Sequence, residues 1–467
     1  MTSRAELVAA VAAVPAGGLL PPRRSGDPVA ATQVALVDVF PLVPATSRDD
    51  LGPGPWVVVA HASDGSWVGI PLVADSHVPL RVRRAAPGDG TAATLLERVV
   101  NPGPLPFAQG DFVLISLDAG ALPPCGAPGE HGFAVDQTHD SVVVDGAAVV
   151  KWAVHLSPRE GDPPAARLLT QLSAVGFTEI PAPLGLLQWR GPRQVGDGGT
   201  VQRTLLASVT AYLPGARDGW DWYVQDLVDH LAGGLSCDSA VEPARTMGGL
   251  VARLHVALAT RTRDNPYPVR RSTPTDAWAW RDDALATLQE ALTTTTGEPG
   301  RRLAARAAAA RRALDGIGDV VRTPVSLVHG DLHVGQVLRW DGGYVVNDFD
   351  GNPVLSPERQ AALQPPARDV AGMLQSLDHV GRIVDRRTGG GDRDAVEGWI
   401  VATREAFLAS YRAELAAAGR AELLDERLLL AFEVEQECRE YVYAARHLPH
   451  WVHVADAAMA ALLPEGD

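Results

Sequence analysis

Two runs of the chain, HGDLHVGQVL and NDFDG, combine carboxylates and an amide at a spacing that suits phosphoryl transfer. In enzymes of this kind one carboxylate orients the attacking hydroxyl and accepts its proton, and further oxygen ligands hold Mg²⁺ on the phosphates of ATP. We predict that Asp331 is the carboxylate that acts on the hydroxyl. Gln336 and Asp348 are the predicted Mg²⁺ ligands, and Asp350 is an additional candidate.

The elements that must position these groups are two short strands and the loop that joins them. Apolar residues precede His329 and occupy 344–346, so that Asp331 and Asp348 stand on the two sides of a hairpin-like unit. A hairpin with solvated acids is the alternative interpretation. The agreement of residue type and spacing at several positions favours the phosphoryl-transfer site.

Lys151 is the only lysine among the 41 lysine and arginine residues of the chain. A lysine is a compact point charge on a flexible stem, and a phosphate site can need this where an arginine fork does not serve. Lys151 lies on the second strand of a predicted β-hairpin, with Asp145-Gly146 at the turn. This layout is typical of a kinase amino-terminal lobe, in which a strand lysine reaches the ATP phosphates. Chance survival of one lysine is the alternative.

The loop ahead of this hairpin contains no G-x-G-x-x-G pattern. Hydroxyls and backbone N–H groups must then contact the phosphates, and the candidates are Thr138, His139 and Ser141. Further along, the segment YLPG at 212–215 is either a hinge whose backbone binds adenine or a plain linker, which makes Tyr212 a candidate nucleotide-binding residue.

The helix predicted to open at Asp162-Pro163 lacks an expected acid. In a kinase lobe this helix supplies a glutamate that pairs with the strand lysine. Ala165 and Ala166 stand where that acid would be. Either Glu160 replaces it from the preceding loop or the pair is absent.

Composition shifts divide the chain into three parts. Residues 1–88 are a predicted β-rich cap module with a hairpin turn at Asp64-Gly65. Residues 89–215 are the predicted sheet-containing amino-terminal lobe with Lys151. From 216 to 467 the apolar spacing becomes helical, with helices predicted at 220–233, 244–259, 278–292, 301–314, from 368, 395–418 and 423–445.

The predicted helix 423–445 has an apolar stripe made by Ala431, Val434, Cys438, Tyr441 and Ala445. Its other face carries Gln436, Glu440, Tyr443 and His447, and this face is either solvated or lines the site of the phosphate acceptor. Acidic and amide groups suit a polyhydroxy acceptor that carries an ammonium. Trp451 follows, and it either stacks on a sugar ring or docks the chain end.

Two further polar residues have alternative roles. His255 lies in a helix among apolar residues, where it is either a core histidine with satisfied hydrogen bonds, which is the favoured interpretation, or a ligand-binding residue. Asp369 either caps the helix that it opens or reaches back to hold the backbone of the 329–331 loop.

Composition narrows the class of protein. The net charge of −15 disfavours nucleic acid and anionic membranes as partners, and the chain has no apolar run of 18 residues. The N-terminus lacks a signal-peptide pattern. Three distant cysteines form no metal-ligand spacing, so we expect reduced thiols and a cytoplasmic protein. The sequence predicts neither protein partners nor an oligomeric state.

The segments around Lys151, Asp331 and Asp348 resemble the aminoglycoside phosphotransferase-like kinases, over about residues 130–450. The resemblance also rests on ARDVAGML, YLPGARDGWDW and YAARHLP, and Gln336 in place of the usual asparagine is similar to maltokinases. It implies an α+β, bilobal, protein-kinase-like fold with an N-terminal cap module and an all-helical C-terminal part. It also implies ATP and Mg²⁺ as cofactors.

Within this group the chain departs from maltokinases, because it lacks their Trp-Phe-Gly-type motif and changes their YEARNRP-type run. It looks like the related glucosamine kinases, which phosphorylate the 6-hydroxyl. The resemblance then implies that acids of the last helix bind the amino sugar, since an ammonium gains a charge-assisted hydrogen bond from a carboxylate. The candidates are Glu435, Glu437 and Glu440, with Gln436, Trp451 and Asp331 as further sugar contacts.

The expected activity is therefore ATP-dependent conversion of glucosamine to glucosamine 6-phosphate. A maltokinase that forms maltose 1-phosphate and an aminoglycoside kinase are alternatives of the same class. A catalytically inactive sensor of nucleotide or sugar is an alternative of another class, suggested by the missing acid and the loop without glycines.

Overall fold

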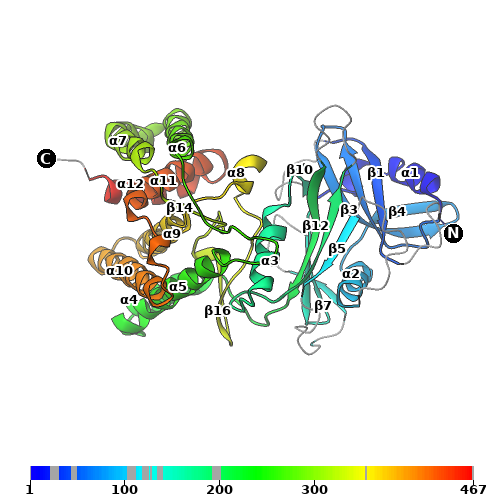
Figure 1. Ribbon diagram of the computed structural model, residues 1–467, viewed down its shortest axis with the longest axis horizontal. Coiled ribbons are helices and arrows are strands. Elements are labelled where there is room, and N and C mark those ends of the chain that lie inside the picture. Colours follow the sequence, from blue (N-terminus) through cyan, green and yellow to red (C-terminus); the bar gives the residue numbers. More distant parts are fainter. Residues whose placement is uncertain are drawn as a thin grey trace. The chain divides into compact units, whose positions relative to one another are not determined.

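The computed structural model describes residues 2–21, 31–43, 50–101, 112–117, 126, 129–133, 140–191, 201–352 and 355–464 (Figure 1). The chain forms two compact units. Unit 1 comprises residues 1–173, 180–214 and 355–361, and unit 2 comprises 174–179, 215–354 and 362–467. Sheets dominate unit 1 and helices dominate unit 2, so the predicted α+β class is confirmed.

The described residues of unit 1 form two antiparallel sheets. The first has the order β1(Val34–Pro41), β2(Trp56–Ala62), β3(Trp67–His77), β4(Leu80–Arg84), and β9(His155–Leu156) pairs with β3. The second has the order β5(Phe112–Ser116), β11(Pro183–Arg190), β12(Gln202–Ala211), β8(Ala148–Trp152), β7(Asp140–Val144), β6(Glu130–Gly132), and β10(Arg159–Glu160) pairs with β12. The helices are α1(Arg4–Ala12), α2(Thr91–Val100), α3(Pro164–Ala174) and α8(Pro357–Ala361).

The hairpin predicted around Lys151 is confirmed as β7 and β8. Asp145 and Gly146 both have positive φ, 52° and 60°, which is the backbone that a tight hairpin turn needs and that Asp-Gly supplies at low cost. Ser141 lies directly opposite Lys151 in the register. The local turn chemistry therefore fixes the strand that carries the lysine.

The two sheets of unit 1 share one apolar core. Phe40, Val57 and Val59 of the first sheet pack in the same cluster as Trp152 and Trp189 of the second. The indole N–H of Trp189 donates to Asp38 Oδ2 at 3.0 Å. The boundary near residue 88 stays a prediction from the sequence. Residues before and after it pack into the same apolar core.

Gly69 of β3 lies where the first sheet meets the chain just after Lys151. Its N–H donates to Val154 O at 2.9 Å, and a Cβ at this position would lie 2.8 Å from Ala153 O. We expect Gly69→Ala to lower the free energy of unfolding by about 1–3 kcal/mol, because the added methyl forces backbones apart. Urea unfolding followed by tryptophan fluorescence measures this.

Gly17→Ala is the matched control, since nothing lies within 4 Å of a Cβ at Gly17. We expect this change to stay within about 0.5 kcal/mol of the wild type. Equal midpoints and slopes for both variants would contradict the close approach at Gly69.

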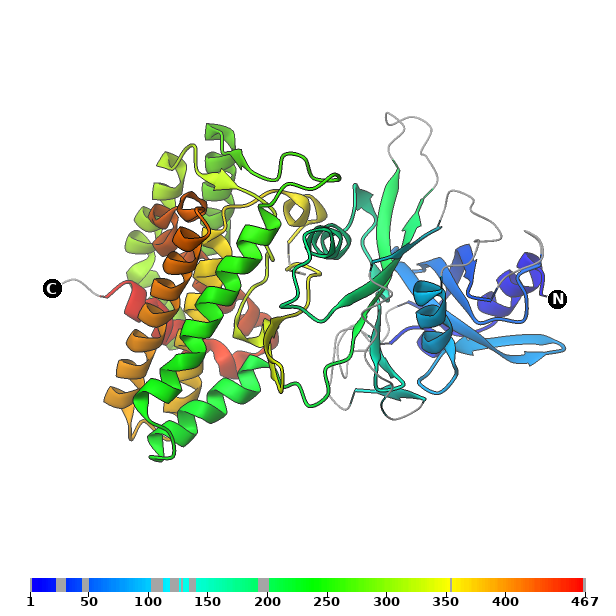
Figure 2. The same cartoon turned by 60° about the horizontal axis from the view of Figure 1, so that its bottom comes forward.

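In its described residues, unit 2 has a helical framework with two short antiparallel sheets added to it. The helices are α4(Gly219–Leu231), α5(Cys237–Leu258), α6(Pro274–Thr294), α7(Gly297–Asp315), α9(Ala367–Arg387), α10(Arg393–Ala417), α11(Leu429–His447) and α12(Val452–Leu462). The sheets pair β13(Arg270–Arg271) with β14(Pro324–Val325) and β15(Val337–Trp340) with β16(Gly343–Val346). Helices α5 and α10 run side by side (Figures 1 and 2).

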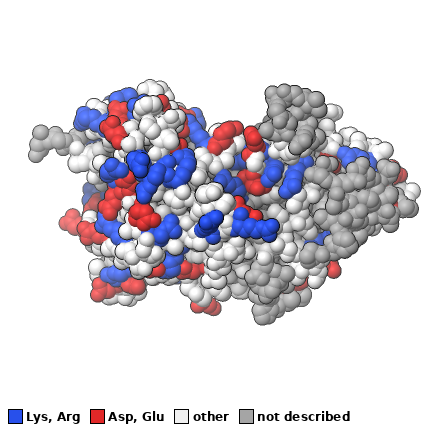
Figure 3. All heavy atoms as spheres, in the orientation of Figure 1, with Lys and Arg blue, Asp and Glu red and all other residues white. Residues whose placement is uncertain are grey.

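The predicted apolar stripe of α11 is buried at Ala431, Val434, Cys438 and Tyr441. Basic and acidic residues are interspersed on the face of unit 2 drawn in Figure 3. None of the helices in the described residues is both long and apolar enough to cross a bilayer.

Candidate active site

The β15–β16 ribbon brings the two predicted metal ligands together. Val337 pairs with Val346 at the end of the ribbon, and Asn347 N donates to Gln336 O at 2.8 Å. Gln336 therefore lies opposite the residue that precedes Asp348. The structure thus places an amide and a carboxylate at the same end of one ribbon, as the sequence predicts.

Asp331 lies in the loop ahead of this ribbon, in a partly enclosed setting. Its Oδ1 accepts a hydrogen bond from Asn352 Nδ2 at 2.9 Å. Burial raises the pKa of Asp331 to about 6, the charges of Asp348 and Asp369 add to the rise, and those of His329 and Arg439 oppose it. A base whose pKa lies close to neutrality is suited to accept a proton from a hydroxyl.

Asn352 was missed as a site residue, because an asparagine after Asp350-Gly351 looks like an ordinary turn residue. We expect Asn352→Ala to lower kcat about 10- to 100-fold, since a hydrogen bond to a charged group contributes about 1.5–3 kcal/mol. Loss of the donor also removes stabilisation of the carboxylate, so the acid limb of the pH–rate profile should move to higher pH. Steady-state kinetics across pH measure both effects.

Asn352→Asp is the companion variant, because it places a second negative charge against Asp331 in nearly the same volume. Its acid limb should lie at higher pH than that of Asn352→Ala. Unchanged acid limbs in both variants would argue against the contact with Asp331.

The loop 329–331 is held from behind by Asp369. Asp369 Oδ2 accepts from His329 N at 2.7 Å, and Oδ1 accepts from Gly330 N at 2.9 Å. The second interpretation of Asp369, in which it holds this loop, is confirmed, whereas α9 has Pro366 as its N-cap and no side-chain cap. Gly372 of α9 lets the helix approach the loop, since a Cβ there would lie 2.5 Å from Leu332 O.

His329 braces the loop from within. Its Nε2 lies 2.9 Å from Asn347 O, and its Nδ1 lies 3.4 Å from Asp331 N. A ring with hydrogen on Nε2 donates to the carbonyl and accepts from the amide, so one tautomer satisfies both contacts. The histidine thereby links the loop of Asp331 to the strand end before Asp348.

The donor set fits Mg²⁺ bound together with nucleotide phosphates. No group of three or more His, Cys, Asp or Glu side chains in the described residues forms a metal site by itself. Mg²⁺ is commonly held by one or two carboxylates, water and substrate phosphates. The amide nitrogen of Gln336 lies 3.4 Å from His333 Nε2, and the amide oxygen is the atom that would bind the ion.

Aromatic rings gather beside the catalytic loop. Trp220 of α4 stacks on His333 with centroids 5.7 Å apart, and Trp451 meets Trp220 edge-on at 6.1 Å. Burial lowers the pKa of His333 to about 4, so this imidazole is neutral at pH 7. The structure therefore brings Trp451, a predicted sugar contact, close to the loop, and it adds Trp220 of the YLPGARDGWDW run, which was not among the predicted sugar contacts.

The predicted sugar contacts on α11 differ in their surroundings. Gln436 Nε2 donates to Glu440 Oε1 at 3.0 Å, and both side chains are half-buried. Glu435 is buried, and its carboxylate accepts from Arg368 at 2.9 Å and from Arg439. The two arginines neutralise Glu435, so this acid supports Arg439 in preference to an ammonium, while Gln436 and Glu440 stay candidates.

Glu437 is also buried, and its carboxylate contacts a histidine of α9. Its Oε1 lies 2.8 Å from His379 Nε2. Burial raises the pKa of Glu437 to about 7, and the charge of His379 and their hydrogen bond oppose the rise. Glu437 thus belongs to a buried ion pair between α9 and α11.

The nucleotide-binding candidates lie in unit 1. Lys151 is flanked by Ser141 on β7 and by Ser208 on β12. The N–H of Tyr212 donates to Ala147 O at 2.8 Å, so this donor is already used and the carbonyl is the remaining backbone group for adenine. His139 lies outside the described residues.

Glu160 does not replace the missing acid. It pairs with Gln202 on β12, whereas Lys151 pairs with Ser208 six residues along the same strand. Six residues of strand span about 20 Å, which is too far for an ion pair. That alternative was therefore wrong, because the chain turns away from β8 before it reaches Glu160.

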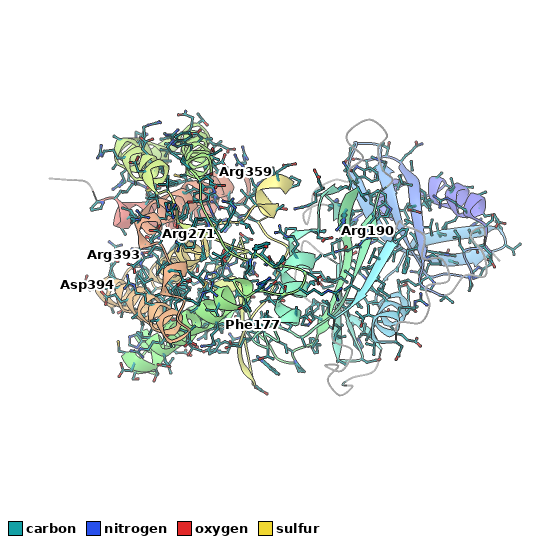
Figure 4. All side chains as sticks on the ribbon, viewed as in Figure 1. Phe177, Arg190, Arg271, Arg359, Arg393 and Asp394 are labelled. Atoms are coloured by element: carbon teal, nitrogen blue, oxygen red, sulfur yellow. The ribbon has the colours of Figure 1, made fainter. Side chains whose placement is uncertain are left out.

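A cavity of about 280 Å³ in unit 2 is separate from these residues. It is lined by Val175, Gly176, Phe177, Arg253, Val256, Ala257, Thr260, Glu414 and Ala418. Phe177 is labelled in Figure 4. None of the predicted site residues lines this cavity.

Comparison with known proteins gives consistent results. The model of the family described as "Phosphotransferase enzyme family" matches residues 133–399. A glucosamine kinase of Streptacidiphilus jiangxiensis is 46% identical over 418 residues, which cover 89% of this chain and 90% of that protein. A glucosamine kinase of Mycolicibacterium smegmatis is 40% identical over 421 residues, 90% of this chain and 98% of that protein.

Solved structures agree with the sequence relatives. A glucosamine kinase in crystal form B is 42% identical with a TM-score of 0.81, covering 98% of this chain and 99% of the other. A glucosamine kinase in complex with glucosamine, ADP and inorganic phosphate is 42% identical with a TM-score of 0.78 and the same coverage.

Proposed function

The chain belongs to the phosphotransferase enzyme family, and from this premise we propose that it transfers the γ-phosphoryl group of ATP to glucosamine. The observation that carries the proposal is the similarity, over 98% of the chain, to a glucosamine kinase solved with glucosamine, ADP and phosphate. The arrangement of Asp331, Gln336 and Asp348 on one loop and ribbon supplies the groups that phosphoryl transfer needs.

Asp331 acts on the acceptor hydroxyl. Its carboxylate accepts a hydrogen bond from the hydroxyl, orients the oxygen towards the γ-phosphorus and takes the proton as the bond to phosphorus forms. Asn352 Nδ2 donates to Oδ1 of the same carboxylate and so holds Asp331 in its orientation. Because the transition state is loose, positioning contributes more than base strength.

The proposal assigns separate roles to the residues that would bind Mg²⁺ and the phosphates. Gln336 and Asp348 bind Mg²⁺, which neutralises phosphate charge when bound, and Lys151 steadies the phosphates with Ser141 beside it on β7. The carbonyl of Tyr212 contacts adenine. A cytoplasmic location, where ATP is supplied, is part of the same proposal.

The 6-hydroxyl is the proposed acceptor, and Gln436 and Glu440 are the proposed contacts of the amino group. Their half-buried pair on α11 offers a carboxylate to an ammonium, which forms a charge-assisted hydrogen bond. Trp451, edge-on to Trp220, offers an apolar face to the sugar ring.

A coupled ADP-release assay with glucosamine, glucose, maltose and kanamycin tests the substrate. We expect turnover with glucosamine to exceed that with glucose at least tenfold in kcat/KM, and ³¹P NMR should show a 6-phosphate. Preference for maltose or kanamycin would favour the alternative acceptors, and ligand-induced thermal shifts without ADP release would favour a sensor.

Glu440→Gln tests the contact with the amino group. We expect the preference for glucosamine over glucose to fall, because the carboxylate discriminates between an ammonium and a hydroxyl. An unchanged ratio of kcat/KM values for the two sugars would remove Glu440 from the sugar site.

A further inference from the structure

Three buried polar side chains from three helices of unit 2 form a continuous chain of hydrogen bonds. Tyr411 of α10 places its hydroxyl 2.7 Å from His255 Nδ1, and His255 of α5 places its Nε2 3.1 Å from Asp369 Oδ2. Tyr411 and His255 are fully buried, and Asp369 is 2% exposed. Helices α5 and α10 lie side by side, which fixes the first of these contacts (Figure 2).

The series of hydrogen bonds from Tyr411 through His255 and Asp369 ends on the backbone of the catalytic loop. Asp369 accepts from the N–H groups of His329 and Gly330, the two residues before Asp331. A shift of Asp369 would therefore be passed directly to the residue that acts on the acceptor hydroxyl. Burial alone would raise the pKa of Asp369, but the hydrogen bond from His255 holds it below the usual value.

The two ring nitrogens of His255 face different partners, Tyr411 at Nδ1 and Asp369 at Nε2. Nε2 faces a carboxylate, so it must donate, and in the neutral ring Nδ1 is then an acceptor. The Tyr411 hydroxyl satisfies that acceptor by donating to it. Without the hydroxyl, Nδ1 would lose this donor, and the His255 ring would no longer be held on the side of Tyr411.

We propose that His255 and Tyr411 are positioning residues for phosphoryl transfer, which act by holding Asp369 in the orientation that fixes the 329–331 loop. The inference rests on the proposed function and adds two residues to it that lie outside the site itself. A core histidine that only stabilises the fold would change the unfolding temperature without changing kcat in the folded enzyme.

Conservative and non-conservative variants at His255 separate the two roles. Gln places an amide N–H near the position of Nε2 and keeps the donor to Asp369, whereas Leu keeps apolar volume and loses it. We expect H255L to lower kcat about 30- to 100-fold and H255Q to stay within about fivefold of the wild type. The KM values for ATP and glucosamine should change by less than about threefold in both.

Tyr411→Phe has a matched control in the same unit. Tyr223 is fully buried, and its hydroxyl donates to Ala240 O at 3.4 Å, outside the chain of contacts to the loop. We expect Y411F to lower kcat about three- to tenfold and Y223F to leave kcat unchanged. Thermal unfolding of each variant records its effect on stability separately.

Hydrogen–deuterium exchange gives a readout that does not depend on the sugar. The peptide that covers 327–335 contains the amides of His329 and Gly330, and its exchange should be faster in H255L and Y411F than in H255Q, Y223F and the wild type. This result stands even if glucosamine proves to be the wrong acceptor.

Equal kcat and equal loop exchange in Y411F and Y223F would overturn the proposal, as would equal losses in folded H255L and H255Q. If H255L does not fold, the comparison of Y411F with Y223F decides by itself.

Discussion

Asp331→Asn is expected to reduce turnover at least about a hundredfold while ATP binding is retained. The amide cannot accept the hydroxyl proton, and it presents a weaker acceptor to the sugar. Nearly equal volume keeps the loop held by Asp369 intact, so nucleotide affinity measured by isothermal titration should stay within about threefold of the wild type. Near-normal turnover in this variant would end the assignment of Asp331.

The pH dependence of the wild type and of Asp331→Asn provides a second test of Asp331. Burial raises the pKa of Asp331 to about 6, so the carboxylate is ionised above this pH and protonated below it. Activity of the wild type should therefore fall as the pH drops through about 6. The residual activity of Asp331→Asn should lack this limb, because the variant has no proton to lose at that position.

Asp348→Asn is expected to lower kcat/KM for ATP at least about a hundredfold, with a higher Mg²⁺ concentration needed for half-maximal rate. Asp348 has a φ of 60°, a left-handed conformation that asparagine tolerates and most residues do not. The variant thus removes the charge with little backbone strain. Titration of initial rates with Mg²⁺ at saturating ATP measures the shift.

Asp350→Asn tests the additional candidate ligand, since it removes a charge two residues from Asp348. A Mg²⁺ dependence within about threefold of the wild type would exclude Asp350 as a ligand, and a shift like that of Asp348→Asn would add it. A Mg²⁺ curve for Asp348→Asn that matches the wild type would contradict the role of Asp348.

The parts of this site that depend on neighbouring residues could be predicted from the sequence. The Asp145-Gly146 turn requires positive φ and so fixes the hairpin that carries Lys151. The short spacing between Gln336 and Asp348 leaves room for little except a tight ribbon, which places both at one end. Where a few neighbouring residues determine the geometry, pattern and structure agree.

Other features depend on partners that are distant in the sequence. Glu435 and Glu437 of α11 are predicted sugar contacts, yet both are buried because Arg368 and His379 of α9 pair with them. Helical spacing cannot reveal such pairing, since it depends on which helices become neighbours. For the same reason the sequence left the role of Asp369 open and overlooked Asn352.

The single ε-amino group on β8 makes the chain unusually simple to address chemically. An amine-directed acylating reagent has only Lys151 and the N-terminal amine as targets, and a lysine-specific protease has only one bond to cut. Protection of Lys151 from modification when ATP is added, read from the mass of one peptide, would test its proposed contact with the nucleotide. Covalent footprinting of this protein therefore needs no mutagenesis to remove competing sites.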